Sequence, residues 1–175
     1  AGRIGRLCPR RIGRDLNYVT IAHGREKYIL AKDLWQNYSK ELGDDPEILT
    51  EYKGWQLIGQ KYKPLFEYYS KNEKLENRTN GWQIYAADFV STEEGTGIVH
   101  IAPAFGEDDM NLSRAEKLPF VQHVSMDGII RSEATDFAGL NVKPKDDVQA
   151  TDVRIIKYLA GKERLFAKEK YEHSY

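Results

Sequence analysis

Alternation of polar and apolar residues predicts that much of this chain forms short β-strands. The clearest case is NYVTIAH at residues 17–23, whose period of two is typical of a strand. A similar segment, 24–32, follows it across a charged turn at Gly24, so the two are predicted to form a hairpin. Further strands are expected within residues 47–53, 56–66, 82–90, 119–131 and 165–175, with a hairpin turn at Asp127-Gly128.

The segment GTGIVHIAP at residues 95–103 is the most apolar of the predicted strands. It begins in glycines and ends at Pro103, and its apolar run is interrupted only by His100. An unbroken run of this kind is typical of a strand that is buried on both faces. We therefore expect residues 97–102 to lie deep in the fold.

Three segments have helical spacing, at residues 31–43, 106–118 and 148–165. Their apolar positions are Leu34, Trp35, Tyr38 and Leu42 in the first helix, and Val148, Val153, Ile156 and Leu159 in the last. Gly43 and Gly161 are placed to end these two helices. The middle helix begins with three acids, the charge that a helix N-terminus favours.

Many short strands, glycine turns and a few inserted helices predict a mainly β fold with flanking helices. Because the strands and helices do not alternate regularly, we favour a closed or half-closed β-barrel over a doubly wound sheet. Residues 15–175 are predicted to be a single domain. Residues 1–14 form an irregular basic head, which is either a native arm for RNA phosphates or a non-native addition.

Composition narrows the classes of function. The net charge is −1, so the whole chain gives no electrostatic argument for nucleic acid or for an acidic ligand. Cys8 is the one cysteine, which excludes an internal disulfide and a cysteine-based zinc site. No apolar run approaches the roughly 20 residues of a membrane span. We therefore expect a cytoplasmic protein with no membrane partner and with no metal in this domain.

The stretch EEGTGIVHIAPAFGEDD at residues 93–109 carries the candidate chemistry. Taken alone, His100 is more often a core histidine than a catalyst, and Asp108 and Asp109 are more often acids at a helix start than ligands. Together they stand at the two ends of a short loop with a proline and a glycine, so we expect both at the rim of one pocket. A carboxylate there binds an ammonium group. Phosphate-binding and serine-nucleophile motifs are absent from the sequence.

At this stretch, AADFVSTEEGTGIVHIAPAFGEDD closely resembles the editing insertion of isoleucyl-tRNA synthetases. Supporting segments are YKPLFEYY, VSMDGIIRSEATDFAGLNV and KEKYEHSY, so the resemblance covers roughly residues 15–175. It implies a β-barrel domain, inserted in an ATP-dependent ligase, that hydrolyses valyl-tRNA(Ile). Discrimination between valine and isoleucine is the standard case in which one methylene is too small a difference and a second, size-excluding site is needed.

The resemblance also implies roles for individual residues. Asp109 matches the aspartate that anchors the substrate α-ammonium, and His100 matches a histidine of the pocket wall; these two form the catalytic pair. The substrate-binding set is Gly95, Thr96, Gly97, Phe105 and Asp108. The implied partners are the 3′ end of tRNA(Ile) carrying valine and the catalytic body of the parent synthetase, with no cofactor in this domain.

One departure from the family pattern lowers the expected activity. In the family, a threonine-rich run precedes the first strand and supplies pocket hydroxyls, whereas AGRIGRLCPRRIGR precedes Asp15 here and contains no threonine. We therefore expect weak or no hydrolysis by this chain. Two alternatives stay open: a module that binds the tRNA acceptor end without hydrolysing it, and a purely structural insertion.

Overall fold

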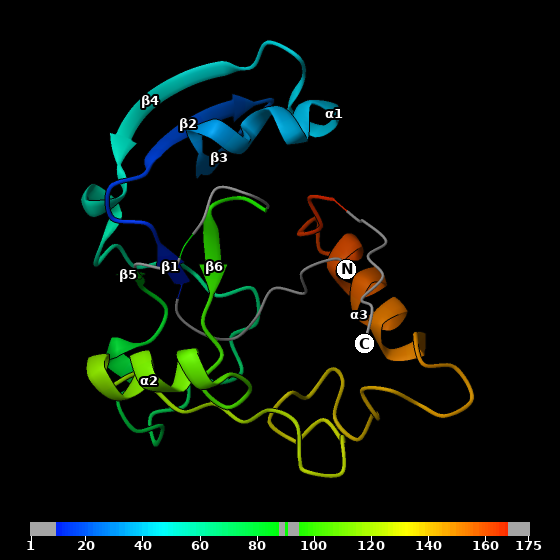
Figure 1. Ribbon diagram of the computed structural model, residues 1–175. Helices are drawn as coiled ribbons and strands as arrows, with labels where there is room; N and C mark the ends of the chain where they lie inside the picture. Colours follow the sequence, from blue (N-terminus) through cyan, green and yellow to red (C-terminus); the bar gives the residue numbers. More distant parts are fainter. Residues whose placement is uncertain (1–9, 88–89, 91–94, 168–175) are drawn as a thin grey trace. The chain divides into compact units, whose positions relative to one another are not determined.

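The computed structural model describes residues 10–87, 90 and 95–167 (Figure 1). These residues group into two compact units. The single domain at residues 15–175 stays a prediction. The strand unit comprises residues 10–63 and 80–102, and the α2–α3 unit comprises residues 64–79 and 103–167. All six assigned strands belong to the strand unit, and the two longest helices belong to the α2–α3 unit.

The first sheet of the strand unit is antiparallel, with strand order β3-β2-β4. It is built from β2 (Asn17–His23), β3 (Glu26–Ala31) and β4 (Glu47–Lys53). The predicted hairpin is confirmed, because His23 pairs with Glu26 across a turn in which Gly24 has a φ of 60°. A positive φ is readily accessible to glycine, which has no Cβ atom to clash.

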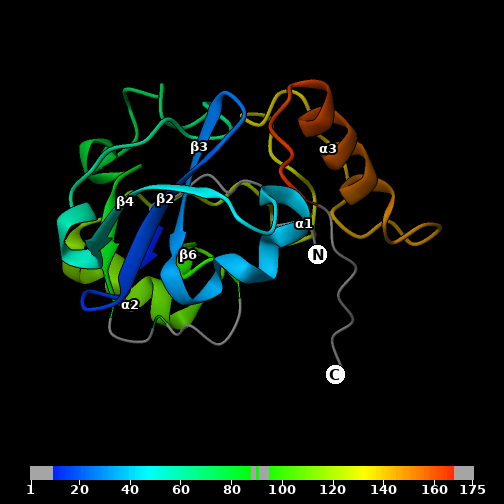
Figure 2. The ribbon, with the colours of Figure 1, turned by 90° about the horizontal axis from the view of Figure 1, so that it is seen from above.

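A helical segment covers one face of this sheet (Figures 1 and 2). The predicted helix at residues 31–43 is confirmed as a 3₁₀-helix, η1 (Lys32–Tyr38), continued by α1 (Ser39–Leu42). It ends at Gly43, whose N–H donates to the Ser39 carbonyl at 2.8 Å. The core beneath it consists of Val19, Ile21, Leu30 and Leu42, with Tyr28, Trp35 and Tyr38 packed against them.

The second sheet has strand order β5-β1-β6. Its central strand, β1 (Arg10–Ile12), pairs in parallel with β5 (Ile84–Ala86) and antiparallel with β6 (Ile98–His100). The predicted irregular head is therefore wrong for residues 10–12, and Ile12 is fully buried. Residues 10–12 become a strand because their backbone groups pair with β5 on one side and β6 on the other, although their sequence shows no strand pattern. The rest of that prediction, residues 1–9, lies outside the described residues.

The prediction of a strand buried on both faces is also wrong for β6. This strand lies at the edge of its sheet, and Ile98, Val99 and His100 are each half-buried. The deeply buried residues of the segment, Ile101 and Ala102, follow the strand. The apolar run therefore predicts buried residues correctly, but the most buried of them, Ile101 and Ala102, lie after the strand and not in it.

The strands of the described residues form two separate three-stranded sheets, and a closed barrel is not found among them. The fold is a mixture of helices and sheets. Where a second strand was predicted after Gly54, the chain instead forms a 3₁₀-helix, η2 (Gly54–Leu57). The Lys53 N–H donates to Oε1 of Gln56 at 2.8 Å, and the Gly54 N–H donates to the Leu16 carbonyl at 2.9 Å. These hydrogen bonds end the pairing of β4 with β2 at Lys53 and start the 3₁₀-helix.

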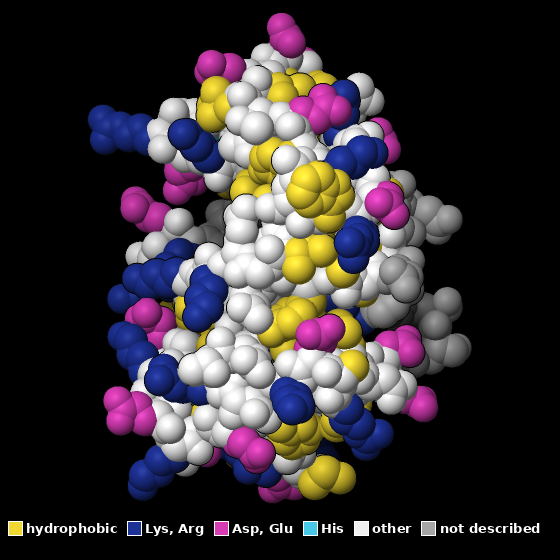
Figure 3. All heavy atoms as spheres, turned by 90° about the vertical axis from the view of Figure 1, so that its left-hand side faces the viewer, with side chains coloured by type: hydrophobic (Ala, Val, Ile, Leu, Met, Phe, Trp, Pro, Cys, Tyr) yellow, Lys and Arg dark blue, Asp and Glu magenta, His cyan; other side chains and the backbone are white. Residues whose placement is uncertain are grey.

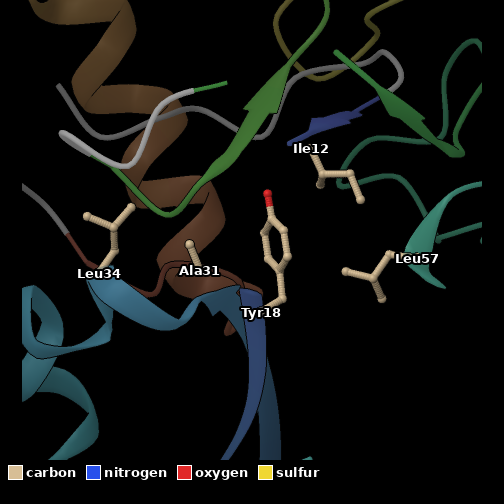
Figure 4. Packing of buried hydrophobic residues seen from close by; sticks show 5 residues of the cluster. All are labelled: Ile12, Tyr18, Ala31, Leu34 and Leu57. Carbon is tan, nitrogen blue, oxygen red and sulfur yellow. The ribbon is translucent and has the colours of Figure 1, made fainter. Parts of the chain in front are cut away.

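An apolar cluster joins the two sheets (Figure 4). It contains Ile12, Tyr18, Ala31, Leu34 and Leu57, all buried. Tyr18 stands on β2 with its hydroxyl directed away from that strand, toward the segments of the second sheet. Partly buried Leu16, Tyr52, Ile84 and Ile98 pack around the cluster. The core of the strand unit therefore lies between its sheets.

The α2–α3 unit contains α2 (Glu107–Glu116) and α3 (Ala150–Gly161), as the sequence predicted. The predicted apolar face of α3 was wrong in part, because Val148 is 60% and Val153 is 38% exposed. The buried residues of α3 are Thr151, Ile155 and Leu159. Sequence spacing alone did not reveal which stripe of the helix meets its neighbours.

The remaining α2–α3 unit is largely irregular. A short 3₁₀ turn, η3 (Arg78–Asn80), lies where the chain passes from residue 79 to residue 80 between the units. The predicted turn at Asp127-Gly128 is present, with a φ of 78° at Gly128, but the segments beside it form only isolated bridges such as Val124 with Ile130. Of the predicted terminal strand, residues 165–167 are irregular and 168–175 lie outside the described residues.

The surface mixes both signs of charge. On the face drawn in Figure 3, Lys and Arg side chains are interspersed with Asp and Glu, and hydrophobic atoms are exposed between them. This mixture agrees with the net charge of −1. A search of the described residues finds no helix that is both long enough and apolar enough to cross a membrane.

Candidate functional site

The Gly-Thr-Gly segment before β6 is held by its backbone to the other sheet. The Thr96 carbonyl accepts the Ala31 N–H at 2.9 Å, and the Gly97 carbonyl accepts the Tyr18 hydroxyl at 2.7 Å. The Thr96 side chain stays local, since its hydroxyl donates to the Ile98 carbonyl at 3.4 Å. The entry of β6 is therefore positioned by β2 and β3.

Gly97 is required by its surroundings as well as by its backbone. Its φ is 69°, a left-handed conformation that side chains disfavour. A Cβ atom added at Gly97 would lie 2.4 Å from the Ala31 Cβ atom, far inside van der Waals contact. Gly95 also has a positive φ, 76°. Gly97 lets the entry of β6 approach the end of β3 closely, which is a structural role that the sequence pattern did not reveal.

His100 ends β6, opposite Arg10 of β1 in the strand register. The residue as a whole is half-buried, but both of its ring nitrogens are shielded from solvent. Imidazole nitrogens in such a place exchange hydrogen bonds with the protein or with a ligand rather than with bulk water. The strand thus fixes the histidine at the point where the chain leaves the sheet.

Asp109 is the third residue of α2, whose N-cap is Gly106. Gly106 has no side chain with which to cap the helix, and the Asp109 Oδ2 atom lies 3.4 Å from the place that a Gly106 Cβ atom would take. The carboxylate therefore folds back over the helix start, where backbone N–H groups favour negative charge. Its Oδ1 atom is shielded from solvent, whereas the neighbouring Asp108 is exposed.

Phe105 precedes the helix and is 51% exposed. Its ring contacts the His123 ring, with the centroids 5.0 Å apart and the planes at 62°. This edge-on contact holds one side of an aromatic ring while the rest faces solvent, an arrangement suited to a binding contact. His123 was not singled out from the sequence, and its contact with Phe105 is a tertiary one.

The predicted site residues divide between the two units. Gly95, Thr96, Gly97 and His100 lie in the strand unit, on one continuous strand and its entry, while Phe105, Asp108 and Asp109 lie in the α2–α3 unit, at the start of α2. Within each unit the residues of the set are neighbours along the chain. The joint action of His100 and Asp109 on one substrate stays a prediction.

Sequence reasoning missed Tyr18, which it treated only as part of a strand. Its side chain is fully buried, and its hydroxyl accepts the Gly13 N–H at 3.0 Å while donating to Gly97. Burial raises the pKa of this hydroxyl, and the Gly13 hydrogen bond partly opposes the shift. The available signal in the sequence was a tyrosine within a predicted strand, because a tyrosine hydroxyl that becomes buried must find hydrogen-bond partners.

The described residues hold no group of three or more His, Cys, Asp or Glu side chains that could bind a metal ion. The arrangement at the two halves of the set is instead a shielded imidazole and a partly shielded carboxylate. A carboxylate can accept hydrogen bonds from an amine, and an imidazole N–H can donate one to a carbonyl oxygen.

Comparison with known proteins finds no matching family model but many relatives among isoleucine–tRNA ligases. The chain is 42% identical to that of Corynebacterium efficiens over 152 residues, which is 86% of this chain and 13% of the ligase. It is 36% identical to that of Mycobacterium leprae over 166 residues, 92% of this chain and 15% of the ligase. It is 38% identical to the isoleucine–tRNA ligase of Bacillus thuringiensis over 161 residues, which is 92% of this chain and 14% of the ligase. The chain thus spans about one seventh of its relatives' length.

A solved structure, "The crystal structure of GlLeuRS-CP1", is similar in fold. The TM-score is 0.66 at 13% sequence identity, and the match covers 95% of this chain and 78% of that chain. At this identity the likeness concerns the fold alone. The chain is homologous to a segment of isoleucine–tRNA ligases and has the fold of a synthetase connective-polypeptide (CP1) domain.

Proposed function

We propose that this chain acts as the editing insertion of an isoleucyl-tRNA synthetase and hydrolyses the aminoacyl ester of valyl-tRNA(Ile). One observation carries the proposal: 86–92% of the chain aligns with a 13–15% segment of isoleucine–tRNA ligases, and the chain itself has the fold of a CP1 domain. An insertion with its own core is suited to a second activity within a larger enzyme. The proposed partners are the catalytic body and the tRNA 3′ end.

The proposed reaction needs no protein nucleophile. The oxygen of a bound water forms a bond to the ester carbonyl carbon, the bond from that carbon to the ribose oxygen breaks, and a water proton passes to the ribose oxygen. Valine and free tRNA result. The domain must hold the substrate amine, admit a valine side chain and place hydrogen-bond donors at the carbonyl.

Asp109 is proposed to anchor the substrate α-ammonium. Its place in the first turn of α2 supports this role, because the helix fixes the carboxylate and one oxygen, Oδ1, is shielded from water. A charge-assisted hydrogen bond is stronger where water is excluded. Asp108, which is exposed, and Phe105 are proposed to contact the substrate beyond the amine.

His100 is proposed to form a wall of the pocket that accepts valine and rejects isoleucine. A side chain at the end of a strand is held by the ladder, so it can exclude one additional methylene group. Gly95, Thr96 and Gly97 are proposed to shape the entry. The hydrogen bonds of the Thr96 and Gly97 carbonyls to β3 and β2 support a fixed conformation.

The test is deacylation of valyl-tRNA(Ile) and of isoleucyl-tRNA(Ile), with a full-length isoleucine–tRNA ligase as the reference rate. We expect this chain to be slower, because residues 1–14 contain no threonine to supply pocket hydroxyls. Asp109→Ala should lower kcat/KM about 100-fold, as expected for losing a charge-assisted hydrogen bond. His100→Ala should allow cleavage of the isoleucyl ester.

The control is Glu107→Ala, which removes an exposed carboxylate from the same turn of α2 and should change the rate less than twofold. Equal losses in the Glu107 and Asp109 variants would reject the anchoring role. Tight binding of the tRNA with no turnover, in this chain and in the ligase segment carrying the threonine-rich run, would favour the binding module instead.

A further inference from the structure

We propose that Tyr18 is a positioning residue for the candidate site, acting through the Gly97 carbonyl at the entry of the strand that ends in His100. The inference rests on the proposed function for its catalytic consequence, but its structural part stands on the geometry of the strand unit alone. Tyr18 lies 79 residues from Gly97 in sequence and belongs to the other sheet.

The Tyr18 hydroxyl bridges two backbone groups that no ladder joins. It accepts the N–H of Gly13, just after β1, at 3.0 Å, and it donates to the carbonyl of Gly97, just before β6, at 2.7 Å. Gly13 and Gly97 flank the Ile12–Ile98 pair of the antiparallel register. The hydroxyl therefore closes the open end of the β1–β6 pair and fixes where β6 begins.

Packing around the bridge leaves little freedom. The Ala31 Cβ atom occupies the space in which a Gly97 side chain would lie, and the Ala31 N–H is bonded to the Thr96 carbonyl. Two consecutive carbonyls, those of Thr96 and Gly97, are thus held by β3 and β2 respectively. A strand held at its entry on two successive residues cannot slip, and a slip of one residue would turn His100 to the opposite face.

The hydroxyl is not needed to fill the core. A phenylalanine ring would occupy the same volume in the cluster of Ile12, Ala31, Leu34 and Leu57 without the cost of burying a polar group. What the hydroxyl adds is directional: it satisfies one donor and one acceptor of the backbone at once. Its role is therefore to orient these backbone groups rather than to provide bulk.

The test compares Tyr18→Phe with Tyr52→Phe. Both remove one hydroxyl from the same sheet, and Tyr52 bonds only the Thr20 side chain, at 2.5 Å, among the contacts of the described residues. Backbone amide NMR signals and amide exchange rates are measured first, because they do not depend on any activity. In Tyr18→Phe we expect faster exchange at Gly13 and shifted signals from Gly97 through His100; Tyr52→Phe should leave these unchanged.

The catalytic arm measures deacylation of valyl-tRNA(Ile) by the same variants placed in a full-length isoleucine–tRNA ligase carrying this segment. Tyr18→Phe should lower kcat about tenfold with KM changed less than twofold, since misplacement affects chemistry more than affinity. A merely structural role would instead lower the amount of folded protein and leave kcat per folded molecule unchanged. Tyr52→Phe should leave both constants within twofold.

A rescue experiment strengthens the assignment. Gly97→Ala should shift the same amide signals through the clash with Ala31. Adding Ala31→Gly should restore them in part, because it removes the atom in conflict but leaves the strain of the left-handed backbone at residue 97. Unshifted signals from Gly97 to His100 in Tyr18→Phe would overturn the inference. Shifted signals in variants of a segment that hydrolyses no aminoacyl ester would instead reject the proposed function and leave the positioning of β6 supported.

Discussion

The two units of this chain stabilise themselves by different means. In the strand unit, all six strands exchange backbone hydrogen bonds, and a buried apolar cluster lies between the two sheets. In the α2–α3 unit, the long irregular segments are held by separate backbone hydrogen bonds, such as that from the Ile130 N–H to the Leu140 carbonyl at 2.9 Å, and by side chains. The side chains include an aromatic cluster of Phe66, Tyr68, Phe137 and Tyr158. The strand unit is thus held by continuous backbone ladders, and the α2–α3 unit by isolated backbone hydrogen bonds and a cluster of aromatic rings.

Each unit also has a tyrosine junction, and the partners of the hydroxyls differ. Tyr18 bridges two backbone groups, whereas Tyr68 and Tyr158 both donate to Oδ2 of Asp136, Tyr158 at 3.2 Å. The partners of the first junction are backbone groups, so it depends on the close approach of the chain at Gly13 and Gly97 rather than on a partner side chain. The second junction depends on one carboxylate. The comparison predicts that single side-chain changes harm the α2–α3 unit most, and added backbone clashes harm the strand unit most.

The largest effect is expected from Phe137→Ala in the α2–α3 unit. Phe137 is buried and makes edge contacts with Phe66 and Tyr158 at centroid distances of 5.8 and 5.1 Å. Its removal should lower the free energy of unfolding by about 4 kcal/mol, as is usual for deleting a buried aromatic ring. Urea denaturation measures the loss, and amide exchange should show it first in residues of this unit.

The control for this variant is Phe120→Ala, because Phe120 belongs to the same unit and is 50% exposed. It should cost less than about 1 kcal/mol. Similar losses in the two variants would mean that the aromatic cluster does not hold the unit together, and the contrast drawn between the units would fail.

A smaller effect is expected from Gly54→Ala in the strand unit. A Cβ atom at Gly54 would lie 2.0 Å from the Gly13 carbonyl oxygen, a backbone atom that cannot rotate away. The expected loss in unfolding free energy is about 3 kcal/mol, the upper part of the usual range for overpacking.

Gly59→Ala is the matched control. It lies in open space with a φ of 81°, so only strain of about 1 kcal/mol is expected. If Gly54→Ala lowers the free energy of unfolding no more than Gly59→Ala does, the backbone at Gly13 moves aside at little cost, and the predicted clash is wrong.

The smallest effect is a loss of stability at alkaline pH. Burial, and then the hydrogen bond to Asp136, raise the pKa of Tyr68 above its ordinary value of 10.0. A raised pKa in the folded state means that the stabilisation is complete below about pH 10 and is lost as the pH rises through the folded pKa. The free energy of unfolding should therefore fall as the pH rises above about 10, and Tyr68→Phe should reduce the fall. An identical fall in Tyr68→Phe would exclude this tyrosine as its cause.

Local patterns predicted those elements that are stabilised locally. The β2–β3 hairpin and the helices α2 and α3 follow from periodicity and from the turn and cap residues near them. Strand β1 could not be predicted, because Arg10–Ile12 has no alternation and becomes a strand only by pairing with residues 84–86 and 98–100. For the same reason, the edge position of β6 was not visible in its own apolar sequence.

For the candidate site, only the positions of its residues in the secondary structure can be compared with the sequence, and their roles stay predictions. His100 at a strand end and Asp109 at a helix start follow from sequence pattern, and the structure places them so. Their assignment to different units does not follow, since a contiguous loop of sequence gives no sign of a boundary at residues 102 and 103. Tyr18 was missed because its partners, Gly13 and Gly97, are backbone groups that any residue type would present.

The order of the two units along the chain has a consequence for how the protein is made. Every strand of the strand unit is encoded before residue 103, whereas α2 and α3 come from the residues that follow. During synthesis the ribosome therefore releases a complete set of strands first, and the contact of Tyr18 with Gly97 is among the last that this set can form. The nascent strand unit can reach its native arrangement while the half of the candidate site that carries Asp109 has yet to emerge.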